Sequence, residues 1–237
     1  DAGYPVVLVE RSDHLGGRMA ELSGTYLNLQ DGPAILQSTL EAVEHHPQIH
    51  ILRQARVTDV SGYVGNFRAR IQVDAAQGDG PVEFDFDVGA IVAATGWRPY
   101  PRTRLAEYGG GELADVVDSL AFEGMLRSGG VPRRPSDGRV PGSIVFIQCA
   151  GSRDRERGVP YCSKTCCMVV AKQAMTYRQR VPAGQATVFY IDIRSAGKGY
   201  EEYVQTAMSR DRVLYLRGKV SRVFEQDGRV VVWDLAE

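Results

Sequence analysis

The chain has 237 residues, 43% of them hydrophobic and 24% charged, and its 28 Lys and Arg against 29 Asp and Glu give a net charge of −1. This length suits one or two domains with a real core, and the balanced charge gives no general attraction to nucleic acid or membrane. No apolar run approaches the roughly 20 residues of a membrane-spanning helix, and no signal-peptide pattern is present. We therefore expect a cytoplasmic α/β protein that binds no nucleic acid and has no membrane span.

In the first half, short apolar runs surround one helical pattern. Residues 4–10 predict a buried strand that ends at Glu10, and residues 33–46 predict a helix with Pro33 in its first turn. Further strands are predicted at 49–60, 67–73 and 84–88, and a fully buried one at 90–96. A second helix is predicted at 113–127.

The second half repeats a regular order of strand and helix. Strands predicted at 143–148, 186–192 and 213–216 are separated by helices at 163–180 and 199–210. This order is typical of parallel α/β units. Strands at 220–224 and 230–233 form a hairpin through the Asp227-Gly228 turn. Residues 131–141, rich in Gly, Pro and Arg, are predicted to be a linker.

The four cysteines lie close together in the sequence, at Cys149, Cys162, Cys166 and Cys167. A secreted disulfide protein spreads its cysteines to join distant segments, so this cluster favours ligands of a soft metal centre. Zinc sites use C-x2-4-C pairs and ferredoxins use other spacings, so the pattern C-x12-C-x3-C-C matches neither. Buried free thiols remain the simpler interpretation.

Glu10 occupies the position of a ribose-binding acid. In dinucleotide-binding folds the second strand ends in an acid that bonds a ribose hydroxyl, and a glycine-rich phosphate loop precedes it by about twenty residues. Only nine residues precede Glu10 here. The acid belongs to a larger pattern, V-V-L-V-E-R-x4-G-G-R, which A-A-T-G-W-R-P follows much later.

These two motifs resemble those of two-dinucleotide-binding-domain flavoproteins of the glutathione and thioredoxin reductase type. The resemblance implies FAD, with Glu10 and its neighbour Arg11 at the adenosine ribose. It also places near the cofactor Gly16, Gly17, Arg18, Val57, Thr95 and Gly96. The simpler alternative is that Gly16-Gly17 is a flexible turn and that residues 94–96 are an ordinary strand end.

The second half lacks the glycines of an NAD site. Its first strand runs into Cys149 and a long polar loop with a single glycine where the nucleotide turn needs several. The segments Q-C-A-G-S-R-D, P-Y-C-S-K-T-C-C-M and D-I-R-S-A-G-K-G-Y-E-E-Y are similar to those of the heterodisulfide reductase A subunit family. They are also similar to the A subunits of quinone-interacting membrane-bound oxidoreductases.

This second resemblance implies an oxidoreductase component that transfers electrons between FAD and a [4Fe–4S] cluster held by the four cysteines. It implies partners similar to the B and C subunits of heterodisulfide reductase and, in some systems, a hydrogenase or formate dehydrogenase. The expected fold is α/β, with two Rossmann-like three-layer units, the first incomplete at its N-terminus, and a small β-meander. The expected domains are a partial FAD-binding domain at 1–130 and a degenerate NAD-binding-like domain at 142–237.

The chain starts at Asp1 without Met and lacks the first phosphate-binding unit, so we expect a fragment. Such a piece is expected to bind FAD weakly and to form homo-oligomers through an open sheet edge. Two other functions stay open: a pyridine-nucleotide disulfide oxidoreductase that uses a redox-active cysteine pair, and a non-catalytic scaffold whose thiols are structural or bind zinc.

Overall fold

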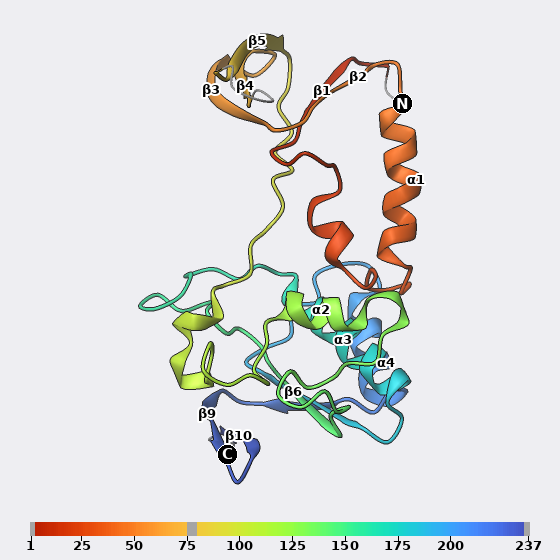
Figure 1. Cartoon of the computed structure of the whole chain (residues 1–237), viewed down its shortest axis with the longest axis vertical. Coiled ribbons are helices and arrows are strands. Elements are labelled where there is room, and N and C mark those ends of the chain that lie inside the picture. The colour runs from red at the N-terminus through yellow and green to blue at the C-terminus, as the bar shows by residue number, and fades with distance from the viewer. Residues whose placement is uncertain (1–2, 75–79, 235–237) are drawn as a thin grey trace. The chain divides into compact units, whose positions relative to one another are not determined.

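The computed structural model describes residues 3–74 and 80–234, which leaves Asp1 outside the described part. The chain forms two compact units (Figure 1). Unit 1 consists of residues 1–20 and 33–97, and unit 2 of residues 21–32 and 98–237. The segment 21–32 therefore leaves unit 1, joins unit 2 and returns, and the predicted linker at 131–141 lies within unit 2.

Unit 1 contains a short parallel sheet and its crossover helix. Strands β1 (Val6–Val9) and β2 (Ile49–Leu52) pair in parallel, and α1 (Gly32–Glu44) connects them. The apolar residues of α1 recur at helical spacing, so one stripe of the helix supplies the packing surface. The N-terminal strand and helix of unit 1 thus follow the sequence pattern closely.

A three-stranded antiparallel sheet completes the regular structure of unit 1. It consists of β3 (Ala55–Tyr63), β4 (Asn66–Val73) and β5 (Val82–Val88), in that order. Ile71 of β4 lies opposite Phe84, whereas Arg70 lies opposite Asp85 and donates from Nε to Asp85 Oδ1 at 3.0 Å. One face is therefore apolar and the other charged. This sheet is the predicted β-meander.

The predicted buried strand at 90–96 is wrong. These residues form no strand and are exposed, and Val92 is 88% exposed. Their β-branched composition favours a strand, but a strand needs a neighbour to pair with. In the described residues β1 pairs with β2 alone, and no strand pairs with this segment.

Unit 2 contains a parallel sheet with the strand order β6-β7-β8. The strands are β6 (Ser143–Ile147), β7 (Gln185–Tyr190) and β8 (Leu214–Arg217), and the connecting helices are α3 (Cys166–Arg180) and α4 (Tyr200–Ser209). The α/β class and the predicted alternation of strand and helix are confirmed.

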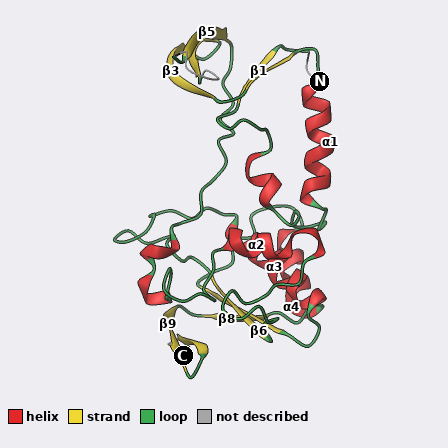
Figure 2. Ribbon diagram, in the orientation of Figure 1, coloured by secondary structure: helices red, strands yellow, loops and turns green. Residues whose placement is uncertain are grey.

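Helices cover one side of this sheet (Figure 2). The helix α2 (Ser119–Leu126) and α4 both contact α3, and together with the sheet they form the larger core. Asp118 accepts a hydrogen bond from the Ala121 N–H at 2.8 Å and caps α2. This cap explains why the helix begins at residue 119 instead of the predicted 113.

A smaller core lies around Tyr108, Phe189, Val220 and Val223. It involves β9 (Val220–Gln226), which forms an antiparallel hairpin with β10 (Arg229–Asp234). The described residues also include 3₁₀ turns that the sequence pattern did not predict, namely η1 (Gly17–Glu21), η2 (Arg102–Arg104), η3 (Ala106–Tyr108) and η4 (Arg127–Gly129).

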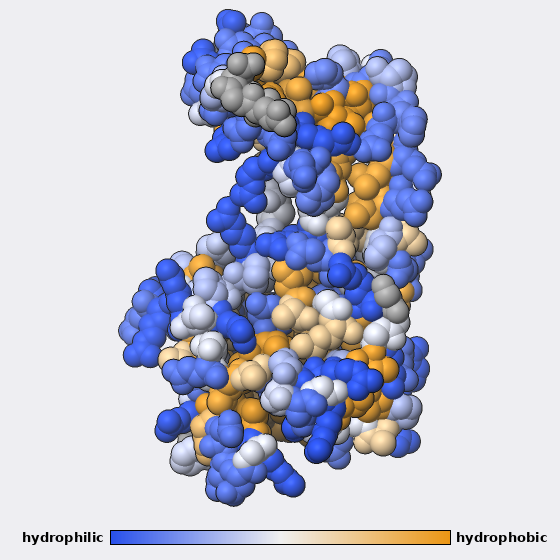
Figure 3. All heavy atoms as spheres, in the orientation of Figure 1, coloured by the Kyte–Doolittle hydropathy of each residue, from blue (hydrophilic) through white to orange (hydrophobic). Residues whose placement is uncertain are grey.

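Apolar side chains also reach the surface, as the orange patches of Figure 3 show. Tyr4, Tyr63, Val64 and Val92 are among the most exposed large apolar residues. No helix in the described part of the chain is long and apolar enough to cross a bilayer.

Candidate functional site

The four cysteines gather at the carboxyl edge of the parallel sheet in unit 2. Cys149 follows the end of β6, Cys162 lies in the next loop, and Cys166 and Cys167 form the first turn of α3. All four are free thiols; Cys167 is buried and the others are half-buried. Ligands of open α/β sheets bind at this edge, and a helix N-terminus favours a thiolate.

The loop that follows Cys149 is held in shape by its own polar groups. Asp154 Oδ1 accepts hydrogen bonds from the Glu156 and Arg157 N–H groups at 2.9 and 3.1 Å. The Tyr100 hydroxyl donates to the Arg157 carbonyl at 2.6 Å. Gly151 is required here because a Cβ at this position would lie 2.3 Å from the Tyr100 ring. The loop is therefore ordered by specific contacts despite its polarity.

Backbone N–H groups point at the cysteine sulfurs. The Lys164 N–H donates to Cys162 Sγ at 3.3 Å and the Arg194 N–H to Cys167 Sγ at 3.4 Å, while the Cys149 N–H donates to Cys166. Cys149 and Lys164 both have left-handed φ angles, of 59° and 62°. Non-glycine residues rarely adopt this conformation, and successive N–H groups in such turns form anion-binding hollows typical of phosphate and iron–sulfur sites.

The thiols differ in acidity. A hydrogen bond from Cys167 is the main reason why the pKa of Cys166 is lowered to about 6, and the same contact raises the pKa of Cys167. Burial, followed by the nearby Cys166, raises the pKa of Cys149. Of the two thiols in the first turn of α3, Cys166 is therefore the more acidic.

Gln148 lies directly beside the cysteines with an unused donor. The residue is 7% exposed, and its Oε1 lies 3.4 Å from Cys167 Sγ. Its Nε2 is buried without a hydrogen-bond partner. The Cys167 thiol donates to this amide oxygen, so once that sulfur is an anionic ligand the amide can turn its unpaired Nε2 donor to it.

The four cysteines supply soft sulfur donors. Within residues 3–74 and 80–234, no three His, Cys, Asp or Glu side chains form a group that would hold one metal ion. A four-iron cube keeps its ligating sulfurs farther apart than one zinc ion does, and soft thiolates are its usual ligands. Four thiols with N–H donors around them therefore fit an iron–sulfur cluster by their chemistry.

Asp192 lies two residues after the end of β7, where an NAD site has its ribose-binding acid. Its Oδ1 accepts from Arg153 Nη1 at 2.5 Å, and its Oδ2 accepts from Arg194 Nη2 at 3.1 Å. The carboxylate is thus already occupied by two guanidinium groups. This arrangement, with the missing glycines, argues against a nicotinamide cofactor in unit 2.

In unit 1, Glu10 directly follows β1 and Arg11 is exposed beside it. Glu10 Oε1 accepts from the Ser12 N–H at 2.7 Å and the Ser12 hydroxyl at 2.5 Å. Burial acts to raise the pKa of Glu10, but the hydrogen bonds from Ser12 outweigh it and leave the pKa below its usual value. The carboxylate therefore stays ionised and acts as an acceptor.

The two flavoprotein motifs meet in unit 1. The Arg18 guanidinium lies 5.8 Å from the centre of the Trp97 ring, so G-G-R contacts the end of A-T-G-W. Thr95 and Gly96 are exposed, and Val57 is 47% exposed on β3. Gly16 has a packing role as well, because a Cβ there would lie 2.7 Å from Leu36 Cδ2.

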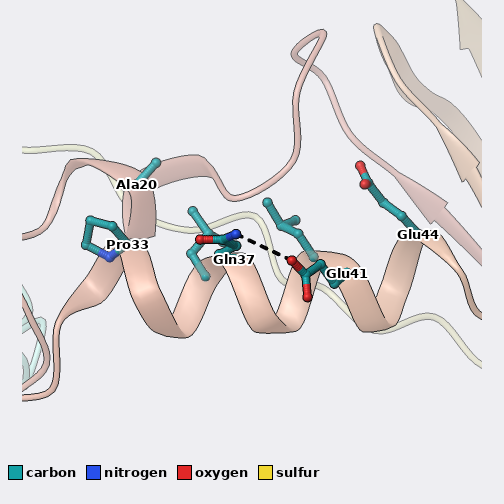
Figure 4. A pocket seen from close by; sticks show the side chains of 7 residues that line it. Ala20, Pro33, Gln37, Glu41 and Glu44 are labelled. Carbon is teal, nitrogen blue, oxygen red and sulfur yellow. Dashed lines mark hydrogen bonds between the residues drawn. The ribbon is translucent and has the colours of Figure 1, made fainter.

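A shallow hollow lies along α1, as Figure 4 shows. Ala20, Pro33, Gln37, Glu41 and Glu44 are among its lining residues, and Gln37 Nε2 donates to Glu41 Oε1 at 3.4 Å. None of the predicted flavin residues lines this hollow. It therefore adds nothing to the candidate flavin site.

Sequence reasoning missed a buried ionic network in unit 2. Lys172 Nζ donates to Glu123 Oε2 at 2.7 Å and to the Gly24 carbonyl at 2.8 Å, and the Gln173 amide donates to Glu123 Oε1 at 2.7 Å. Ser23 donates to the same carboxylate through its N–H and its hydroxyl. A lysine and a glutamate at helical positions resemble an ordinary solvated surface, and no local signal marks them as buried.

Comparison with known proteins finds relatives among heterodisulfide reductases, whereas no family model matches. The A subunit of the ferredoxin/F420H2-dependent CoB–CoM heterodisulfide reductase of Methanosarcina acetivorans is 31% identical over 98% of this chain and 39% of its own length. An iron–sulfur A subunit of the CoB–CoM heterodisulfide reductase of Methanopyrus kandleri is 32% identical over 95% of this chain and 46% of its own length. The chain thus spans less than half the length of these relatives.

Among solved structures, the bacillithiol disulfide reductase Bdr of Bacillus cereus matches 96% of this chain and 67% of its own length, with 13% identity and a TM-score of 0.44. At that level of similarity the match carries no functional information. The sequence relatives, in contrast, confirm the resemblance to heterodisulfide reductase A subunits that the motifs indicated.

Proposed function

We propose that this chain, a homologue of the A subunits of heterodisulfide reductases, is the part of such a protein that transfers electrons between FAD and a [4Fe–4S] cluster. The observation that carries the proposal is the gathering of four free thiols at the carboxyl edge of unit 2, with backbone N–H groups directed at their sulfurs. In a dinucleotide-binding fold this edge holds the ligand.

The cluster would be held by Cys149, Cys162, Cys166 and Cys167. When bound, FAD exchanges two electrons singly with a one-electron centre, so the pair links two-electron and one-electron chemistry. The residues of the chain hold the ligands in place: the loop after β6 presents Cys149 and Cys162, and the first turn of α3 presents the other two. Donors to the sulfurs stabilise the thiolate form.

FAD is proposed to bind unit 1 through the residues of the two motifs. The ionised Glu10 carboxylate supports a ribose contact, and the exposed Thr95 and Gly96 leave their backbone open to a ligand. The Arg18–Trp97 contact supports a shared role of both motifs. The remaining proposed contacts are Arg11, Gly16, Gly17 and Val57.

The proposed partners follow from the relatives. Each of these relatives is named as the A component of a multi-subunit reductase, and the one from Methanococcus maripaludis is named for H2/formate:CoB–CoM heterodisulfide, ferredoxin reductase. We propose proteins similar to the B and C subunits of heterodisulfide reductase as partners, with a hydrogenase or formate dehydrogenase in some systems. A cytoplasmic location is part of the same proposal.

One observation favours a second function. The low pKa of Cys166 and the adjacent Cys167 thiol are features of a reactive thiol pair in a disulfide oxidoreductase. Against it stands Asp192, whose carboxylate is taken up by two arginines where a nicotinamide nucleotide would need it. The cluster therefore remains the better-supported function.

Iron and acid-labile sulfide, measured after anaerobic reconstitution, test the proposal. We expect about four of each per chain and a broad visible absorbance. Both should be lost in Cys162→Ser, which lies in the loop, and in Cys167→Ala, with circular dichroism as the control for folding of the buried variant. The exposed Arg155→Gln should load normally. Zinc without colour would support the scaffold, and NADPH-dependent reduction of a dithiol substrate would support the second function.

A further inference from the structure

Three charged side chains form a chain of ion pairs beside Cys149. Arg153 Nη1 donates to Asp192 Oδ1 at 2.5 Å, and Arg194 contacts the same carboxylate through Nε at 3.2 Å and Nη2 at 3.1 Å. The Arg153 guanidinium also lies beside Cys149. Arg153 thus joins a proposed cluster ligand to an acid 39 residues away in the sequence.

Arg153 differs from the other cations of its loop. The Arg155 and Arg157 side chains are exposed and make no hydrogen bond or ion pair within the part of the chain that the structure describes. Arg153 is only 25% exposed and has a left-handed φ of 60°. That conformation is costly for a non-glycine residue, so surrounding contacts must maintain it. The Arg153 N–H donates to the Tyr161 carbonyl at 3.3 Å, and the side chain pairs with Asp192.

We propose that Asp192 is a positioning residue that holds the Arg153 guanidinium against Cys149, so that a cluster at the four cysteines experiences a fixed positive charge. This inference rests on the proposed function and identifies how the site is tuned. The acid position that binds a ribose in a nucleotide domain here organises the surroundings of the cluster.

The direction in which the reduction potential changes distinguishes a positioning role of Asp192 from a direct effect of its charge. A positive charge close to a cluster favours its reduced form and raises its reduction potential. Removal of Asp192 removes a negative charge, which by Coulomb's law alone would raise the potential. If Asp192 holds Arg153 in place, its removal instead releases the Arg153 guanidinium into solvent. The positive charge is screened there, and the reduction potential of the cluster falls.

The test uses the reconstituted 237-residue chain and measures the midpoint potential by electron paramagnetic resonance during a redox titration. We expect the potential to fall in Arg153→Gln and in Asp192→Ala, with unchanged iron and sulfide content. In the double variant Arg153→Gln/Asp192→Ala the loss of Asp192 should cause no further fall. Arg153→Lys should recover only part of the shift, because lysine cannot bond both partners with a planar fork. Arg155→Gln is the matched control and should leave the potential unchanged.

A failure of this inference and a failure of the proposed function give different results. A loaded protein whose potential rises in Asp192→Ala, or does not change in Arg153→Gln, overturns the inference while the proposed function stands. An equal fall in Arg155→Gln also overturns it, because a diffuse loop charge would then explain the result. Absence of iron and sulfide in the unchanged protein overturns the proposed function and this inference together.

Discussion

The unused amide donor of Gln148 gives a residue-scale test of whether the cysteine site is built for an anion. A buried donor without a partner costs about 1–3 kcal/mol. We therefore expect Gln148→Met to leave the metal-free chain as stable as before or to stabilise it by about 1 kcal/mol. The measurement is urea unfolding of the reduced, metal-free protein.

In the cluster-loaded protein, by contrast, we expect the amide donor of Gln148 to stabilise the site. Gln148→Glu keeps the shape of the side chain and the oxygen that accepts from Cys167, but replaces the unpaired Nε2 donor with a second acceptor. We expect less iron and sulfide per chain in this variant after reconstitution. Clear destabilisation of the metal-free Gln148→Met chain, with normal loading of Gln148→Glu, would assign the amide a purely structural role.

Substitutions at Gly16 and Gly17 distinguish a packing role of these glycines from a role in cofactor binding. Gly16 has a φ of 108° and a Cβ there would overlap Leu36, whereas at Gly17, with a φ of 45°, a Cβ meets nothing within 4 Å. In the absence of FAD we expect Gly16→Ala to cost about 2 kcal/mol of unfolding free energy and Gly17→Ala about 1 kcal/mol. Thermal or urea unfolding measures the difference. Equal costs would show that Leu36 moves aside freely.

The sequence marks these glycines as a turn or a cofactor contact, but it does not show why a glycine is needed at position 16. A glycine pair after an acid signals a turn or a ligand, and only the packing of Leu36 on Gly16 shows the structural demand. The sequence likewise shows Gln148 as the residue before Cys149. That its amide donor is buried without a partner depends on how β6 and α3 pack together. Contacts between distant segments carry this information, and a single sequence does not reveal them.

At the scale of elements, the Glu123–Lys172 pair anchors segment 21–32 to α2 and α3. Both side chains are almost fully buried, at 1% and 3% exposure. Removing one partner leaves a buried charge, so we expect Glu123→Gln to cost about 3–5 kcal/mol. The double variant Glu123→Leu/Lys172→Met should cost less than the single one, since it leaves no charge unpaired. A double variant that is less stable than Glu123→Gln would contradict this account.

This pair also predicts an acid-sensitive stability. Burial acts to raise the pKa of Glu123, but Lys172 and the hydrogen bonds from Ser23 outweigh it and lower the pKa. The stabilising contribution is therefore present above the usual carboxyl pKa and is lost as the pH falls through the lower folded value. The stability difference between the unchanged chain and Glu123→Gln should shrink as unfolding is measured from pH 7 down to about pH 3. A difference independent of pH would contradict the ionised pair.

The segment at 90–97 shows where element prediction fails. Its apolar composition predicts a buried strand, yet Val92 is 88% exposed. We therefore expect Val92→Lys to change the unfolding free energy by less than about 0.5 kcal/mol. Val188→Ala, in the buried strand β7, should cost clearly more. Rapid amide hydrogen exchange at 90–96 would support the extended, unpaired segment, and a large cost of Val92→Lys would contradict it.

Other elements were predictable because their signals are local. The alternation of β4 and β5 and the repeated strand–helix order of unit 2 depend on residues close in the sequence. Helix α2 begins later than its apolar pattern because Asp118 caps it, a signal that a capping search finds. The exposed 90–96 segment differs, since a strand also requires a partner that the pattern cannot supply.

At the scale of the whole molecule, the two units differ in the size of their parallel sheets. Unit 2 has a three-stranded parallel sheet with its connecting helices, and it includes the segment 21–32 from the first half of the sequence. Unit 1 has a two-stranded parallel sheet in its described residues and a meander with exposed Val57 and Phe84. The division of the chain is thus discontinuous, which a linker search along the sequence cannot detect.

We expect this chain to bind FAD weakly. The proposed contacts in unit 1 are spread over Glu10–Arg18, β3 and the exposed Thr95-Gly96, while the chain spans less than half the length of its curated relatives. A cofactor held by few, solvent-exposed groups gains little from burial, so we expect a dissociation constant weaker than about 1 μM for this chain. Isothermal titration with FAD measures it, and Glu10→Ala should weaken the residual binding further. The exposed Asp31→Ala, outside both motifs, serves as the control. Tight binding by the unchanged chain would show that unit 1 already contains the determinants of the flavin site.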